Sequence, residues 1–148
     1  VRNSQFSLSN IYVQQGDMEQ GEKILEEVLA EDPESTQANN DLGYLWADQN
    51  KNLDQAKTMI EKALAAEPEN PAYLDSMGWV LYRLEQYEEA ADYLQQATQQ
   101  ENGDDSTIYD HLGDCLQKLG RDEEAADAWN RALELEQEKS HPDEELLN

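Results

Sequence analysis

A large apolar residue followed by glycine or serine recurs along the chain at a nearly constant interval. The four pairs are Leu8-Ser9, Leu42-Gly43, Met77-Gly78 and Leu112-Gly113. Successive pairs are 34, 35 and 35 residues apart. A period between about 20 and 50 residues is typical of proteins built from stacked supersecondary units, none of which buries its apolar face alone. The chain is therefore expected to fold as a row of four similar units.

A second pattern repeats at the same interval, a small residue followed four positions later by a bulky one. Its members are Gly21 and Leu25, Ala56 and Ile60, Ala90 and Leu94, and Ala125 and Trp129. The two patterns stay in register except for one extra residue in the stretch 49–52 and one in the polar stretch 101–105. Insertions are tolerated in connections, so each unit is predicted to be a pair of helices joined by a short turn.

The period of the apolar residues within each unit is helical. Proline disfavours helix at the residue before it, so Pro33 and Pro68 mark the ends of two second helices. The first helices are predicted at 3–15, 36–49, 71–84 and 106–119, and the second helices at 18–31, 53–66, 87–101 and 122–137.

These residues resemble the tetratricopeptide repeat, which combines a Leu-Gly pair, a Tyr, an Ala and a closing Pro at fixed offsets. The Tyr position holds Tyr12, Trp46, Leu81 and Leu116, and the Pro position holds Pro33, Pro68, Asn102 and Gln137. The resemblance implies an all-α, right-handed solenoid of four antiparallel helix-turn-helix units. Its repeats would span 2–35, 36–70, 71–105 and 106–139, giving a domain over 1–139 and a polar tail over 140–148.

The stretch 70–84 is similar to repeats of large bacterial proteins of this type, and Val1 opens directly into a helical pattern. We therefore expect the chain to be part of a longer bacterial protein. Small residues in both helices let two backbones approach closely. On this ground we predict packing roles for the following residues: Gly43, Ala56, Gly78, Ala90, Gly113 and Ala125.

The net charge of −24 argues against nucleic acid and anionic lipid as partners, because phosphate groups are repelled by an acidic surface. No apolar run reaches the length needed for membrane insertion. The single cysteine, Cys115, excludes an intramolecular disulfide. These observations and the repeat resemblance favour a protein-interaction scaffold with no enzymatic activity.

Side chains of the first helices that lie outside the core stripe share one flank and are expected to line the binding groove that the resemblance implies. The predicted site residues are Asn10, Asn40, Tyr44, Asp48, Asp75, Trp79, Tyr82, Arg83, Asp110 and Asp114. Aromatic residues are enriched at interface hot spots, and neighbouring carboxylates favour a cation. We predict a protein or peptide partner with basic and apolar character. In the alternative interpretation, Tyr44, Trp79 and Tyr82 pack between adjacent repeats.

Relatives that bind a terminal carboxylate use Lys, Asn and Arg on these faces. Here the corresponding positions hold Phe6, Asn10, Asn40, Asp41, Ala72 and Ser76. An acidic tail is therefore not the expected ligand.

Chemistry at a metal or nucleophile is a weaker interpretation. His111 and Cys115 are four residues apart on one predicted helix, but neither a second Cys nor a second His pair completes a metal site. Cys115 falls in a position for small residues, where burial is expected. The acidic loop 101–105 lacks the alternating spacing of a calcium loop. We predict no cofactor and no bound metal.

Self-association is the alternative function. The last predicted helix carries a run of apolar residues that a further helix would normally cover, namely Ala128, Trp129, Ala132, Leu133 and Leu135. An uncovered apolar face favours a homodimer or packing of the tail that contains Leu146 and Leu147.

Overall fold

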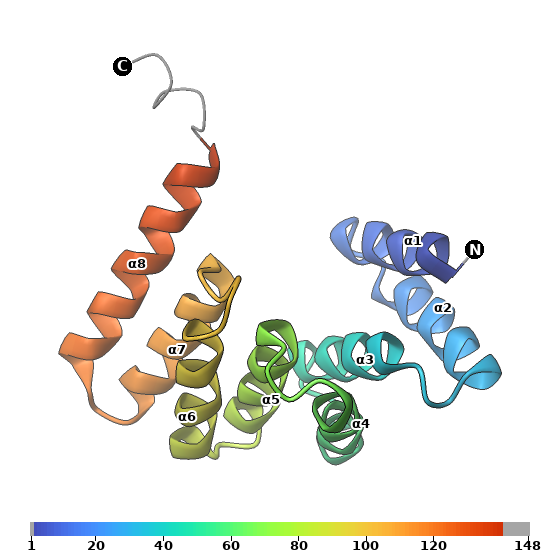
Figure 1. Ribbon diagram of the computed structural model, residues 1–148, viewed down its shortest axis with the longest axis horizontal. Helices are drawn as coiled ribbons and strands as arrows, with labels where there is room; N and C mark the ends of the chain where they lie inside the picture. Colours follow the sequence, from blue (N-terminus) through green and yellow to red (C-terminus); the bar gives the residue numbers. More distant parts are fainter. Residues whose placement is uncertain (1, 141–148) are drawn as a thin grey trace. The chain divides into compact units, whose positions relative to one another are not determined.

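The computed structural model describes residues 2–140, and every regular element in that range is an α-helix (Figure 1). The helices are α1 (Arg2–Gln14), α2 (Met18–Glu31), α3 (Thr36–Asp48), α4 (Leu53–Ala66), α5 (Pro71–Arg83), α6 (Tyr87–Thr98), α7 (Ser106–Lys118) and α8 (Asp122–Ser140). They pair as the hairpins α1–α2, α3–α4, α5–α6 and α7–α8. The predicted all-α repeat of four helical hairpins is confirmed.

Most predicted helix ends agree with the structure to within one residue, and the two larger differences have local causes. α6 ends at Thr98, not at 101, because the chain turns back over the helix end: the Gly103 amide donates to the Gln100 carbonyl at 2.9 Å. A Cβ on Gly103 would lie 2.1 Å from the Ala97 carbonyl oxygen, so only glycine fits this close approach. α8 extends to Ser140 because its last turns are rich in Glu, Gln and Lys, which favour helix. The predicted tail residues Leu146 and Leu147 lie outside the described residues.

One position of the repeat adopts a left-handed backbone in every hairpin turn. It is occupied by Gly16, Asn50, Glu85 and Gly120, with φ of 85°, 56°, 65° and 77°. The extra residue predicted in the stretch 49–52 lies in the α3–α4 turn, where Asn52 also has a positive φ of 50°. The insertion therefore leaves both helices of that hairpin intact.

Polar side chains cap the start of several helices, including three of the four first helices. The carboxylate of Asp17 accepts from the Gln20 amide, and the hydroxyl of Ser35 accepts from the Ala38 amide. Asp105 caps α7 in the same way through Thr107. At α5, Asn70 accepts from two amides and Pro71 occupies the first turn. Such caps satisfy amides that have no partner within the helix, so they fix where each helix begins.

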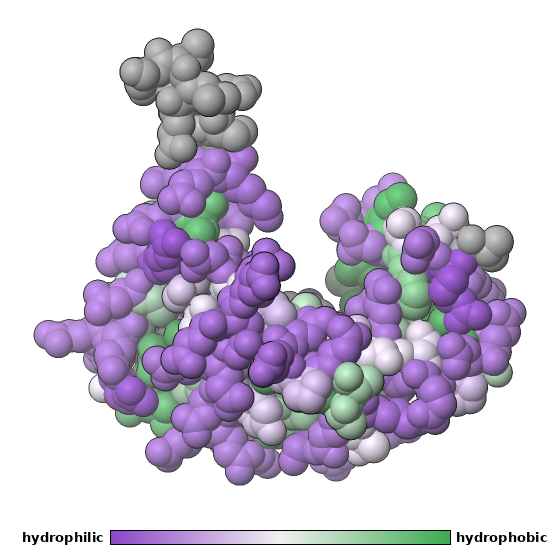
Figure 2. Space-filling model, in the orientation of Figure 1, coloured by the Kyte–Doolittle hydropathy of each residue, from purple (hydrophilic) through white to green (hydrophobic). Residues whose placement is uncertain are grey.

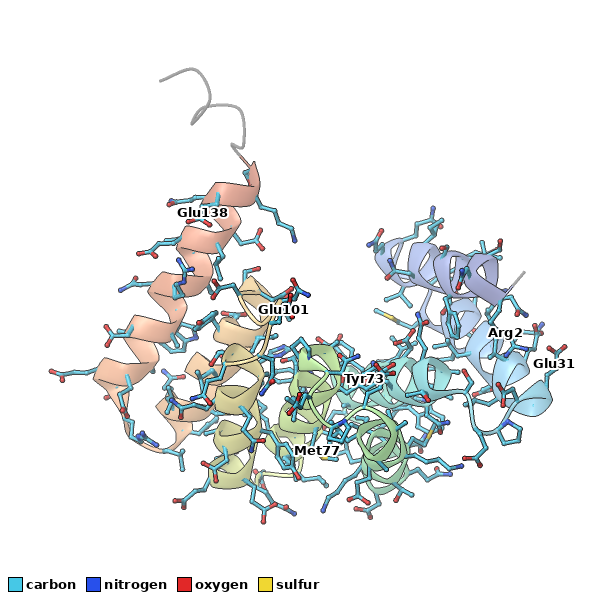
Figure 3. All side chains as sticks on the ribbon, viewed as in Figure 1. Arg2, Glu31, Tyr73, Met77, Glu101 and Glu138 are labelled. Carbon is cyan, nitrogen blue, oxygen red and sulfur yellow. The ribbon has the colours of Figure 1, made fainter. Side chains whose placement is uncertain are left out.

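The chain divides into two compact units, and the boundary lies after Pro68. Unit 1 contains α1 to α4, and its core is built on Leu25, Leu42 and Leu45. Around these residues pack Phe6, Val13, Met18, Leu29, Trp46 and Met59. In its first hairpin the hydroxyl of Ser9 donates to the Gly21 carbonyl at 2.8 Å. Serine at this position of the repeat thus joins α1 to α2. Arg2 and Glu31 link the same two helices at the surface, 3.3 Å apart (Figure 3).

Unit 2 contains α5 to α8, with α7 packed against both α5 and α6. Every residue of α5 from Tyr73 to Leu81 is buried, including Tyr73 and Met77 (Figure 3). The predicted packing glycines lie at close contacts between paired helices: a Cβ on Gly78 would lie 2.5 Å from Leu94 Cγ, and one on Gly113 would lie 2.3 Å from the Trp129 indole nitrogen. The packing roles of these two glycines are confirmed.

The apolar face of α8 is covered more fully than predicted. Ala128 and Ala132 are buried, and the half-buried Trp129 lies against Gly113 of α7. Leu133, at 57% exposure, is the large apolar side chain of α8 that remains open. None of the helices between residues 2 and 140 has the length and apolar character needed to cross a membrane.

Candidate functional site

Trp79 of α5 is the centre of a stacked cluster in unit 2. Its ring lies nearly parallel to that of Tyr82, with centroids 4.9 Å apart, and to that of His111, with centroids 3.9 Å apart. The Arg83 guanidinium lies 4.8 Å from the Trp79 ring centroid, a cation–π distance. Only 7% of Trp79 is exposed. Its indole therefore packs against Tyr82, His111 and Arg83 and has little solvent-accessible surface for a ligand.

Asp75 and His111 form a buried pair between α5 and α7. The His111 Nδ1 lies 2.8 Å from an Asp75 carboxylate oxygen, and the two side chains are 9% and 10% exposed. A carboxylate accepts hydrogen bonds, so this contact orients the imidazole that stacks on Trp79. The sequence places Asp75 in the wall of an open groove, and the structure corrects this: its carboxylate is engaged inside unit 2.

Asp114 lies half-buried on α7, one turn beyond the exposed Asp110. Burial raises the pKa of the Asp114 carboxyl, and repulsion from the Asp110 charge raises it further. Trp129 opposes both effects by donating its indole N–H to Asp114 Oδ1 at 3.2 Å. A desolvated negative charge beside a second one favours an approaching cation.

Tyr82 is half-buried and lies within electrostatic range of Asp114. Burial raises the pKa of its phenol, and the Asp114 charge raises it further. Tyr87 packs edge-on against the same ring, with centroids 5.4 Å apart. Tyr82 is thus an aromatic platform, backed by Trp79 and bordered by Asp114.

The predicted site residues of unit 1 differ in how exposed they are. Asn10 on α1 and Asp48 on α3 are exposed, and Tyr44 on α3 is half-buried. Asn40 is buried: its Nδ2 donates to Asp41 Oδ1 at 3.1 Å, and no donor among residues 2–140 reaches its Oδ1. Burial raises the pKa of the Asp41 carboxyl, an effect that the hydrogen bond from Asn40 opposes. Asn40 is therefore not the open groove residue that the sequence predicts.

The structure brings six of the ten predicted residues into unit 2 and places four in unit 1. The side chains of unit 2 that are exposed or half-buried are Tyr82, Arg83, Asp110 and Asp114. For Trp79 the packing alternative describes the structure better, because its main ring contact is with His111 of the next hairpin.

Sequence reasoning missed two residues, His111 and Trp129. Asp75 and His111 are separated by 36 residues, one repeat plus one position, which places them side by side on neighbouring first helices. That offset could have revealed the pair. The sequence predicts Trp129 both as the bulky residue that fills the space beside the small residues of its repeat and as part of an uncovered face of the last helix. The structure agrees with the first prediction, since Trp129 lies against Gly113, and it shows in addition the contact with Asp114.

Cys115 is buried, as predicted, with no exposed area. Burial raises the pKa of its thiol to about 12, with smaller contributions from the charges of Asp114 and Asp75. A thiol with this pKa holds almost no thiolate at neutral pH, so Cys115 is a poor nucleophile. Within the described range, no group of three or more His, Cys, Asp or Glu side chains is arranged to hold a metal ion.

Two family models match the chain. The model described as Tetratricopeptide repeat matches residues 10–79, and the model described as Anaphase-promoting complex, cyclosome, subunit 3 matches residues 49–132. No curated protein sequence matches at a significant level.

Three solved structures illustrate the similarity of the fold. PilF of Pseudomonas aeruginosa is 27% identical, with a TM-score of 0.74 over 90% of this chain and 60% of PilF. MamA of strain AMB-1 is 25% identical, with a TM-score of 0.61 over 90% of this chain and 72% of MamA. MamA from Desulfovibrio magneticus RS-1 shares the fold, with 20% identity and a TM-score of 0.71 over 90% of this chain and 74% of that one.

The family matches together cover residues 10–132, which include parts of all four hairpins. The chain belongs to the tetratricopeptide-repeat family.

Proposed function

We propose that the chain binds a partner protein through a segment that carries Lys or Arg beside an apolar anchor. Tetratricopeptide-repeat proteins are protein-interaction modules and in general are scaffolds, not enzymes. The contact proposed for this chain lies on α5 and α7 of unit 2, at Tyr82, Asp110 and Asp114. Tyr44 and Asp48 on α3 supply a second contact of the same chemistry.

One observation carries the proposal: the half-buried Tyr82 ring lies against Trp79 and within electrostatic range of Asp114. A ring held in place by stacking loses little entropy when it binds an apolar side chain. The adjacent carboxylates then attract the cationic group of the ligand, and the net charge of −24 steers basic segments toward the chain.

Arg83 limits how strongly this surface attracts a cation. Burial and the Asp110 charge raise the pKa of the Asp114 carboxyl, and the positive charge of Arg83 opposes that rise, so Arg83 partly compensates the carboxylate before any ligand arrives. A bound Lys or Arg therefore shares Asp114 with Arg83, and replacement of Arg83 by Gln is expected to strengthen binding of basic peptides.

The proposal is tested by panning random peptides displayed on phage against the chain, then measuring selected peptides by fluorescence polarisation. Enriched peptides should carry Lys or Arg near Leu, Phe or Trp. Replacement of the basic residue by Glu should abolish binding, and Tyr82→Ala should weaken it roughly tenfold or more. Enrichment of acidic peptides, or of peptides recognised through a free carboxyl terminus, would overturn the proposal.

Two matched variants distinguish loss of the proposed contact from the effects of removing any tyrosine or any negative charge. Tyr93→Ala removes a half-buried tyrosine of α6 that is not part of the proposed contact, and it should leave affinity unchanged. Glu123→Gln on α8 changes the net charge as Asp114→Asn does, but it lies outside the proposed contact. If Glu123→Gln weakens binding as much as Asp114→Asn, the attraction is only that of the overall charge.

A further inference from the structure

We propose that α8 of one copy docks on α1 of a second copy, so that the chain associates head to tail. This surface is separate from the proposed peptide contact on α5 and α7. The large apolar side chains that are exposed among residues 2–140 are Leu8, Ile11 and Leu133. Leu8 and Ile11 lie one turn apart on α1, and Leu133 lies on α8. Figure 2 shows hydrophobic residues at the surface over both of these helices.

The repeat identifies what covers the α1 positions elsewhere in the chain. One period of 34 residues later, Leu8 and Ile11 correspond to Leu42 and Leu45 of α3. Those two leucines are 1% and 5% exposed and form the core of unit 1 with a residue of α2. The face that Leu8 and Ile11 form is therefore one that the second helix of another hairpin covers inside this molecule.

The same comparison shows that Leu133 of α8 occupies the repeat position that Leu29 occupies in α2. It lies eight residues after Ala125 of the repeat pattern, as Leu29 lies eight residues after Gly21. Leu29 packs against the core that contains Leu42 and Leu45. The α2–α3 contact inside unit 1 is thus a template for a contact between α8 of one copy and α1 of the next.

Charge decides which surface an α8 helix can approach. α8 carries seven acidic and two basic residues, so it is repelled by acidic surfaces. Of the helices within residues 2–140, α1 alone has no Asp or Glu. Its one charged side chain, Arg2, forms an ion pair with Glu31 of α2. An α8–α8 dimer would instead place two strongly acidic helices side by side, so the structure favours head-to-tail contact over the symmetric dimer expected from the sequence.

A head-to-tail contact is heterologous, because two different surfaces of the chain meet in it. It can therefore be tested by mixing two variants that each lack one of these surfaces. Leu8→Asp with Ile11→Asp blocks the α1 face, and Leu133→Asp blocks the α8 face. Each variant alone should be monomeric in sedimentation velocity at roughly 10 µM to 1 mM, where the unmodified chain forms dimers and larger species. An equimolar mixture of the two variants should form a one-to-one dimer that does not grow, because each partner retains one open face.

Each other outcome contradicts the proposal. A monomeric unmodified chain over that range removes the contact. Dimerisation of the α1 variant by itself shows an α8–α8 dimer, and dimerisation of the α8 variant by itself shows an α1–α1 dimer. Failure of the two variants to associate when mixed also refutes the head-to-tail arrangement.

Control variants keep the test independent of folding and of net charge. Asn3→Asp with Asn10→Asp on α1 adds two negative charges, as the α1 variant does, and Lys139→Gln on α8 changes the net charge by one unit, as Leu133→Asp does. These exposed positions lie on other sides of the two helices, so both controls should associate like the unmodified chain. Circular dichroism reports whether each variant folds, and Leu133→Gln with Ile11→Gln replaces the aspartates if one does not. Tyr82→Ala should leave association unchanged, so failure of the peptide proposal and failure of this one are distinguishable.

Discussion

The imidazole of His111 stacks on the indole of Trp79 at a centroid distance of 3.9 Å and joins the first helices of two neighbouring hairpins. Asp75 fixes the imidazole from one side, and Tyr82 lies parallel to the indole. The exposed part of the proposed site therefore rests on a buried layer. We therefore expect substitutions of the exposed side chains to change mainly binding, and substitutions of the buried side chains to change mainly stability.

Replacement of the buried layer should cost stability. Trp79→Ala removes a side chain that is 7% exposed, so we expect a loss of about 3–5 kcal/mol in the free energy of unfolding. The half-buried Tyr82 should cost less when truncated, while affecting binding directly. Urea denaturation followed by circular dichroism measures both. If Trp79→Ala unfolds at the same urea concentration as the unmodified chain, the indole does not hold the two hairpins together.

Asp114→Asn should raise stability and lower affinity for basic peptides. The pKa of the Asp114 carboxyl is raised in the folded state, mainly by burial, so its ionisation works against folding. That destabilisation appears as the pH rises from the unfolded pKa through the folded pKa, and it persists at neutral pH. Asparagine keeps an oxygen that can accept from the Trp129 indole.

The measurement is urea denaturation of both proteins across the acidic range and at neutral pH. The stability difference in favour of Asp114→Asn should grow as the pH rises and vanish at pH values below both pKa values. A variant that is less stable at neutral pH would show that the carboxylate contributes more through its hydrogen bond than it costs through desolvation.

Glu85→Gly should stabilise the protein. Glu85 has a φ of 65° at a repeat position where two other hairpins carry glycine. A left-handed backbone costs a non-glycine residue about 1–2 kcal/mol, and part of that gain is offset by the greater freedom of glycine in the unfolded chain. We expect a gain of about 1 kcal/mol in thermal or urea denaturation. Gln95→Gly, at an exposed position inside α6, should destabilise and serves as the control.

Gly78→Ala should destabilise the α5–α6 hairpin, because the new methyl group would lie 2.5 Å from Leu94 Cγ. Overpacking of this kind costs about 1–3 kcal/mol. Leu94→Ala by itself leaves a cavity, but it also makes room for the methyl group. In a double-mutant cycle the two losses should therefore add to more than the loss in the double variant. Additive losses would show that the two side chains do not share this space.

Cys115 should resist thiol reagents in the folded protein. Its thiol has no exposed area, and burial raises its pKa to about 12, so almost no thiolate is present near neutral pH. Iodoacetamide labelling followed by mass spectrometry should show slow modification that becomes rapid in urea. Rapid labelling without urea would indicate local opening of unit 2 around α7.

The periodic spacing of residues such as Gly43 and Ile60 is sufficient to predict all four hairpins, because helix period and close approach at small residues are local and repeated properties. Both insertions were predicted to lie in connections, and they do. The candidate site was predicted less well, because helical spacing places Asp75 and Trp79 on a face but does not say what covers that face.

The sequence by itself determined the fold, the family and the acidic character of the surface, since each depends on which residues are present and at what interval. The tertiary structure decided which side chains remain accessible. Trp79 and Asp75 are buried because His111 of the next hairpin, one repeat and one residue after Asp75, stacks on the first and pairs with the second. Leu8, Ile11 and Leu133 remain exposed, although residues at the equivalent positions 42 and 45 are buried. Burial of this kind depends on what packs against a helix from another unit of the repeat, and the order of residues within one helix does not contain that information.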